Sequence, residues 1–134
     1  MKNFVDLKFH HIGIAVKDFE KLLEFYTLLE IKNAINRIKK ISSSKITLMY
    51  GHQSLPTKPE NAHMSYMSKL ANQFKLPIGY QDHCDGDHES RFWLPAASLG
   101  MNISILEKHI THDRNKKGID HESVLNPLEY FKNI

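Results

Sequence analysis

Cysteine is almost absent from the sequence. Cys84 is the only cysteine among the 134 residues, so an intramolecular disulfide is excluded and the chain does not need oxidation to fold. A reducing compartment fits this best, and we expect a cytoplasmic protein. Long apolar runs are also absent: the opening residues, MKNFVDLKF, contain no secretory h-region, and no run reaches membrane-spanning length. We therefore expect no association with a membrane.

An excess of charge of one sign is missing as well. Eighteen basic and fifteen acidic residues give a formal net charge of +3, which is too small to indicate a nucleic-acid partner. The basic run RIKKISSSK, residues 37–45, is predicted to be a solvated strand or loop. With 41% hydrophobic and 25% charged residues, the composition is that of an ordinary globular protein that can bury a core without staples.

Histidine, in contrast, is abundant. The chain contains nine, and histidine is the commonest metal ligand in proteins, although most histidines bind no metal. In the stretch FHHIGIAV, the alternation of a strand places His11 on the same face as Gly13 and Ala15. Such small neighbours leave space for a metal, a ligand or another backbone, so His11 is a candidate site residue.

The order of predicted elements suggests a weak internal duplication. The first unit has a strand over 9–16, an amphipathic helix capped by Asp18 and ending near Glu30, and a strand over 44–50. After a loop, the second unit has a short strand over 62–67 and a helix that stops before Pro77. A polar loop over 81–90 and two strands around a turn at 96–100 complete it, and a tail with a possible short helix follows.

Three stretches resemble one known superfamily. HHIGIAVKDFEKLLEFY, FWLPAASLGMNISILEK and AHMSYM are similar to segments of the vicinal oxygen chelate proteins, which include glyoxalase I and methylmalonyl-CoA epimerase. The resemblance implies an α+β fold in which two βαββ-type modules, at about 8–55 and 62–108, form a curved mixed sheet around a cup. It implies a domain over 1–108, a C-terminal extension over 109–134, and the homodimer that is common in the family.

The resemblance also implies a metal site. It places two ligands of a divalent metal, Zn, Ni, Mn, Co or Fe, at His11 and His63. The other two ligand positions fall on Thr47 and Ser104, whose hydroxyls are not comparable ligands. Glu107 lies three residues after Ser104, and this odd separation turns it to the opposite strand face unless a bulge intervenes.

Four side chains are candidates for contact with a small-molecule substrate. Thr47 and Ser104 occupy the two remaining positions of the cup. Arg91 could meet an anionic group of the substrate, and Trp93 could line the pocket.

Three functions compete on this basis. The first is a metal-dependent isomerase, epimerase or lyase acting on a small oxygen-bearing substrate. The second is a metal-deficient family member that serves as a small-molecule-binding or accessory protein. The third is a histidine-rich metal-binding protein, disfavoured because zinc sites usually show paired ligands at short recurrent spacings. Its candidate ligands form two sets: His83, Cys84, Asp85 and His88, or His109, His112 and His121.

Overall fold

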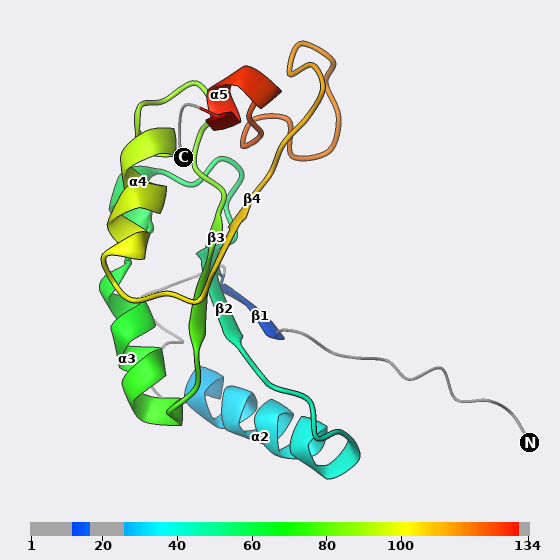
Figure 1. The fold of residues 1–134 in the computed structure, drawn as a ribbon, viewed down its shortest axis with the longest axis vertical. Coiled ribbons are helices and arrows are strands. Elements are labelled where there is room, and N and C mark those ends of the chain that lie inside the picture. The colour runs from blue at the N-terminus through cyan, green and yellow to red at the C-terminus, as the bar shows by residue number, and fades with distance from the viewer. Residues whose placement is uncertain (1–11, 17–25, 132–134) are drawn as a thin grey trace, which may run out of the picture.

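The described chain is built around a parallel sheet. The structure is a computed structural model that describes residues 12–16 and 26–131, so His11 lies outside the described residues. Four strands form the sheet in the order β1-β2-β3-β4, and every neighbouring pair is parallel (Figure 1). Their bounds are Ile12–Val16 (β1), Leu48–His52 (β2), Ile78–Asp82 (β3) and Ile105–Lys108 (β4).

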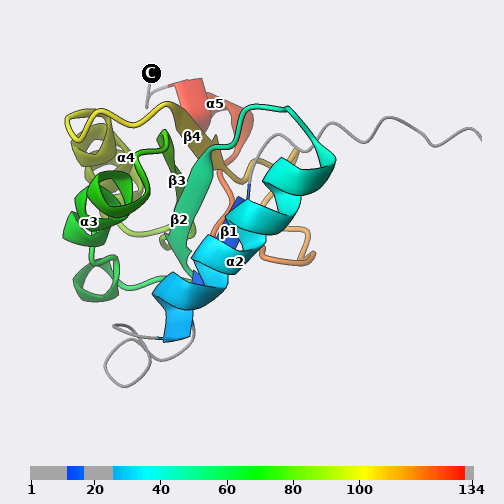
Figure 2. The same cartoon turned by 90° about the horizontal axis from the view of Figure 1, so that it is seen from below.

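Helices connect the strands in sequence. They are α2 (Tyr26–Ile41), α3 (Ser65–Phe74) and α4 (Ser90–Leu99), and the view from below shows them around one side of the sheet (Figure 2). Parallel neighbours require such crossovers because the chain must return to the same end of the sheet. A 3-10 turn, η1 (Pro59–Asn61), precedes α3, and a short helix, α5 (Pro127–Phe131), follows β4. Among the described helices, none is long and apolar enough to cross a membrane.

The core lies between the sheet and these helices. Alternate residues of β2 and β3 point to it and are almost fully buried: Leu48, Tyr50, Ile78 and Tyr80. They pack against one apolar stripe from α2 and another from α3, formed by Ile31, Ile35, Tyr66, Met67 and Leu70. The intervening strand residues face the other side of the sheet, which leaves that side free to carry polar groups at the strand ends.

The predicted fold is wrong in its sheet. A curved mixed sheet made of two βαββ modules would contain antiparallel pairs, whereas all three pairings among the described strands are parallel. Two stretches are helical against the prediction: residues 37–41, expected in a solvated strand or loop, belong to α2, and residues 91–95, expected in a strand, belong to α4. Isoleucine favours strands by residue type, but Ile31, Ile35 and Ile38 recur at helical spacing in α2 and pack on the core.

The prediction is also wrong about elements in the second unit, which begins at residue 62. Residues 65–67, predicted as part of a strand, begin α3, and residues 81–82, predicted as the start of a polar loop, are the last two residues of β3. Residues after 108 pack back against the chain, since Leu125 is fully buried and forms an isolated β-bridge with Ile110. The division of the chain at residue 108 stays a prediction.

Candidate metal centre

Three potential metal ligands meet at the carboxyl ends of β3 and β4. One ligand atom each from His83, Glu107 and His109 lies within 4.8 Å of the other two. His83 directly follows β3, Glu107 lies in β4, and His109 directly follows it. Loops at the carboxyl ends of parallel strands are where α/β proteins build their binding sites, so topology alone makes this the expected location.

The register of β3 and β4 explains why these residues share a face. Gln81 pairs with Glu107, and Asp82 pairs with Lys108. Because strand side chains alternate, Glu107 and His109 point to the side of the sheet away from the helices. The amide Nε2 of Gln81 donates to both carboxylate oxygens of Glu107, at 3.2 and 3.4 Å, which holds that carboxylate at the strand edge.

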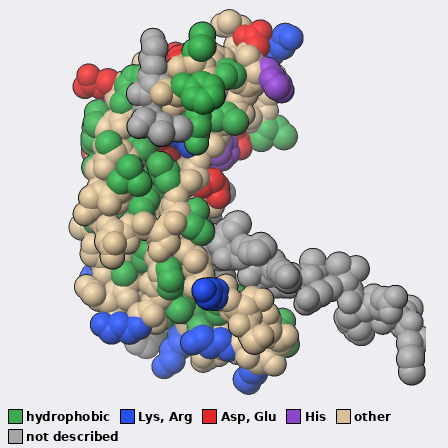
Figure 3. Space-filling view, in the orientation of Figure 1, with side chains coloured by type: hydrophobic (Ala, Val, Ile, Leu, Met, Phe, Trp, Pro, Cys, Tyr) green, Lys and Arg blue, Asp and Glu red, His purple; other side chains and the backbone are tan. Residues whose placement is uncertain are grey.

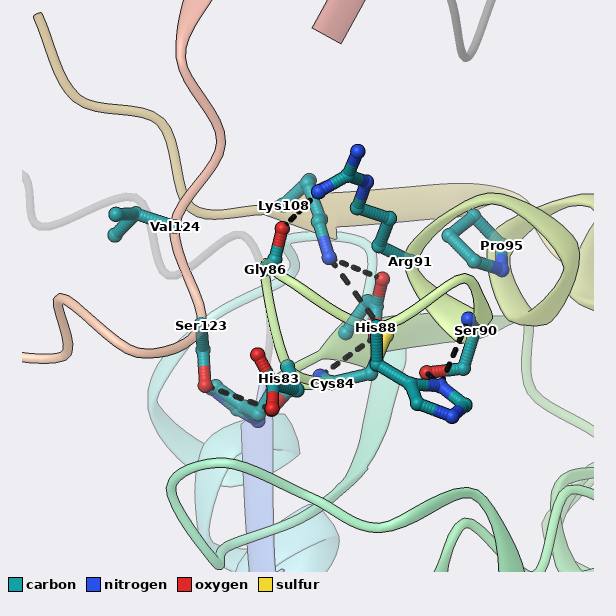
Figure 4. Close-up of polar contacts among 12 residues, drawn as sticks. His83, Cys84, Gly86, His88, Ser90, Arg91, Pro95, Lys108, Ser123 and Val124 are labelled. Carbon is teal, nitrogen blue, oxygen red and sulfur yellow. Dashed lines mark hydrogen bonds and ion pairs between the residues drawn. The ribbon is translucent and has the colours of Figure 1, made fainter. Parts of the chain in front are cut away.

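His83 is a buried imidazole, with 6% of its surface exposed. Burial lowers its pKa, and the neighbouring His109 lowers that pKa further, so the ring is held in the neutral form that binds metals. Its backbone carbonyl accepts hydrogen bonds from the Ser123 hydroxyl at 2.7 Å (Figure 4) and from the Thr57 N–H at 2.8 Å. Its Nδ1 is buried and has no hydrogen-bond partner within the described part of the chain.

His109 lies against His83 and against a carboxylate. The two rings meet edge to face with centroids 5.1 Å apart. The Nδ1 of His109 is 3.6 Å from a carboxylate oxygen of Asp120. A carboxylate behind a histidine ring is the usual device that orients a metal-ligating imidazole.

The donor set fits a divalent transition metal. Two imidazoles and one carboxylate form a set that holds such ions and leaves coordination positions open for other oxygen atoms. The unpartnered Nδ1 of His83 supports this fit, because buried polar atoms normally have a partner. Lys and Arg side chains gather instead over α2, at the far end of the molecule in Figure 3, so the basic surface is separate from this cluster.

The loop after β3 is fixed by residues from α4 and from the C-terminal segment. The carbonyl oxygen of Gly86 accepts hydrogen bonds from both Arg91 and Arg114, and the contact with Arg91 is drawn in Figure 4. Arg91 is also 3.5 Å from the Glu129 carboxylate. The Nδ1 of His88 accepts the Ser90 N–H at 3.1 Å, at the start of α4. The described contacts of Arg91 and His88 are therefore intramolecular and hold this loop against α4 and the C-terminal segment.

The structure separates the other predicted site residues. His63 is exposed just before α3, with φ of 41°, and Trp93 is 45% exposed on α4. Thr47 and Ser104 directly precede β2 and β4. Because the strands are parallel, both lie at the end of the sheet opposite to the three-residue cluster.

Sequence reasoning found parts of the cluster without joining them. His83 and His109 fall in two separate candidate sets, and Glu107 is considered only as a carboxylate three residues after Ser104. One signal was available: Glu107 and His109 stand two apart after an apolar strand, which puts both on one face. The adjacency of His83 to this pair depends on the β3–β4 pairing, for which the single sequence offers no local sign.

Comparison with known proteins identifies the family. The NeuB family model matches residues 25–134. The chain is similar to N,N'-diacetyllegionaminic acid synthases of Campylobacter jejuni, with 36% identity over 75% of the chain, and of Legionella pneumophila, with 30% identity over 80%. It spans only 29% and 30% of the length of these relatives.

A solved structure gives the same answer. The N-acetylneuraminic acid (sialic acid) synthetase from Leptospira borgpetersenii, crystallised with citrate, superposes with a TM-score of 0.68 at 32% identity. This match covers 78% of the present chain and 35% of that chain. The resemblance to vicinal oxygen chelate proteins is therefore wrong, together with the isomerase, epimerase, lyase and accessory functions that it implied. The chain belongs to the NeuB family.

Proposed function

We propose that this chain supplies the metal centre of a synthase that makes a sugar acid of the sialic acid type. The observation that carries the proposal is the convergence of His83, Glu107 and His109 at the ends of two paired parallel strands. The cluster lies within the segment that the NeuB family model matches. Relatives with this segment are named as synthases of legionaminic and sialic acids, and their products are small molecules.

The three side chains would hold a divalent first-row metal such as Mn, Zn, Co, Ni or Fe. The imidazoles of His83 and His109 supply nitrogen donors, and the carboxylate of Glu107 supplies an anionic oxygen. The negative charge of Glu107 matters, because two neutral imidazoles alone would leave the positive charge of the metal ion uncompensated at a half-buried site. A bound metal of this kind polarises a carbonyl or hydroxyl oxygen of a sugar substrate.

Neighbouring residues keep the ligands ready. Gln81 donates to Glu107 and restricts its carboxylate. Asp120 faces the Nδ1 of His109 and favours the tautomer with a proton there. The carbonyl of His83 is held by Ser123 and Thr57. Each ligand therefore has its own support, as a preorganised site requires.

Binding of the reaction product tests this function without assuming that the chain is active alone. N-acetylneuraminic acid is titrated into the manganese-loaded chain by calorimetry, with glucose as a sugar that has no carboxylate. We expect binding of the sugar acid only when metal is present, and no binding of glucose. Glu107→Gln and His109→Ala should weaken binding about tenfold or more, the usual cost of disturbing a metal site.

Lys40→Met is the matched control, because Lys40 is exposed on α2 at the far end of the molecule. It should leave both metal and sugar-acid binding unchanged. Equal affinity of the sugar acid for metal-loaded and metal-free protein would contradict the proposal. So would equal affinity for the wild type and the two site variants.

A further inference from the structure

A buried ion pair lies at the last paired position of β3 and β4, between Glu107 and the two candidate histidine ligands. Asp82 and Lys108 pair directly in the β3–β4 register, and the Nζ of Lys108 is 2.6 Å from a carboxylate oxygen of Asp82. Gln81 and Glu107 form the preceding pair, and His83 and His109 are the first residues after the two strands. By strand alternation the ion pair points to the helix-covered side, while the residues on either side of it point to the metal cluster.

Both charges are removed from water. The side chain of Asp82 is 0% exposed and that of Lys108 is 6% exposed. Removing two such charges from water carries a large desolvation penalty that offsets their attraction, so a well-packed apolar pair would be about as stable. Stability alone therefore does not account for the pair, whereas the fixing of a unique register is an attested role of such groups.

The Asp82 carboxylate also controls the backbone around His83. Its other oxygen accepts the Cys84 N–H at 3.0 Å and the Cys84 thiol at 2.5 Å. A side chain that accepts the N–H two residues ahead closes an Asx turn, and His83 is the residue inside that turn. Figure 4 shows Lys108 extending toward Cys84, with Nζ 3.7 Å from the sulfur. One carboxylate thus joins β4, through Lys108, to the turn that carries His83.

We propose that Asp82 and Lys108 are positioning residues that align His83 with Glu107 and His109 so that all three can bind one metal ion. The inference rests on the proposed metal centre. Neither residue is a ligand, because both point away from the cluster. A slip of one residue between β3 and β4 would turn Glu107 and His109 to the helix side, and the ion pair opposes that slip at the adjoining position.

The test compares metal affinity in variants that remove one or both charges. Calorimetry with Mn²⁺ and the absorption spectrum of bound Co²⁺ are measured on Asp82→Asn, Lys108→Met, Lys108→Arg and the double variant Asp82→Leu/Lys108→Met. Circular dichroism gives the folded fraction, and Lys40→Met is the control for the loss of a lysine charge. We expect Asp82→Asn and Lys108→Met to weaken metal binding about tenfold or more. Lys108→Arg, which keeps the charge, should stay within about threefold of the wild type.

The double variant separates positioning from simple stabilisation. With no lone charge left, its thermal stability should return toward that of the wild type, while its metal affinity stays low and its Co²⁺ spectrum altered. If metal affinity returns together with stability, the pair is only structural and the inference is overturned. Wild-type affinity in folded Asp82→Asn and Lys108→Met overturns it too, with the metal centre intact. Absence of metal binding in the wild type would instead overturn the proposed function itself.

Discussion

The rings of His83 and His109 lie edge to face, 5.1 Å between centroids with an interplanar angle of 79°, although they follow different strands. The contact exists because β3 and β4 are parallel neighbours whose carboxyl ends coincide. It places two candidate metal ligands beside the carboxylate of Glu107.

Acidification should destabilise the metal-free protein. Burial and His109 lower the pKa of His83 in the folded state, and burial and His63 lower that of His52. The unfolded chain, with ordinary histidine pKa values near 6.5, therefore binds more protons in the range just below 6.5. Stability is full above this range and falls as pH decreases through it. Thermal melts in a chelator from pH 7.5 to 5 measure the slope, which His83→Gln should reduce. An unchanged slope in that variant would exclude His83 as a source.

A methyl group at Gly51 should strain the sheet. A Cβ there would lie 2.5 Å from the Gln81 carbonyl oxygen and 2.8 Å from the Gln81 Cβ, so β3 would have to move. We expect Gly51→Ala to cost about 1–3 kcal/mol of unfolding free energy, measured by urea denaturation. Gly118→Ala is the control, since nothing lies within 4 Å of a Cβ at that position. Equal stability of the two variants would mean that β2 and β3 are not this close.

Truncation of Leu70 should leave a cavity between α3 and the sheet. Leu70 is fully buried in the main core, and Leu70→Ala is expected to cost about 2–5 kcal/mol. Leu99 is 60% exposed on α4, so Leu99→Ala should change stability by about 0.5 kcal/mol or less. Denaturant midpoints of the two variants check this, and a similar loss in both would contradict the packing described.

The thiol of Cys84 should be unreactive in the folded protein. It is fully buried, and burial together with the Asp82 carboxylate raises the pKa of this thiol to about 12, so the reactive thiolate is scarce at neutral pH. A chromogenic disulfide reagent should react slowly with the native chain. In guanidinium it should titrate the single cysteine at once. Rapid reaction of the native protein would place Cys84 near solvent.

Local patterns predicted those elements whose signal lies in neighbouring residues. The apolar run before Gly51 is a strand, as is the run that ends at Lys108. The helix before Pro77 is also present, although it begins earlier than predicted. The two strands are predictable from contiguous apolar residues and the helix from the proline that follows it. Strand β2 runs one residue past Gly51, to His52.

The errors arose where tertiary packing overrode local propensity. The isoleucines of α2 and the aromatic run of α4 favour strands by residue type. The isoleucines instead form a buried helix face, and α4 buries Leu94 while it leaves Trp93 exposed. Pro95 is buried inside α4, and the turn predicted at 96–100 is helical as far as Leu99. Parallel strands need crossover helices between them. Because parts of α2 and α4 were not predicted as helices, the sequence did not predict a parallel sheet.

The candidate site was predicted only in fragments for a related reason. The sequence places His109 two residues after Glu107, but their approach to His83 depends on a strand pairing across an intervening helix. Parallel pairing leaves no turn signal of the kind that marks a hairpin. His11 lies outside the described residues, so its role as a ligand stays a prediction, as does the homodimer.

The position of a bound metal tests the central claim most directly. Crystals of the chain soaked in Mn²⁺, with anomalous diffraction data collected for that element, would locate the ion. The account predicts one strong anomalous peak within bonding distance of His83, Glu107 and His109. A metal bound elsewhere, or no peak among these side chains at saturating Mn²⁺, would contradict it.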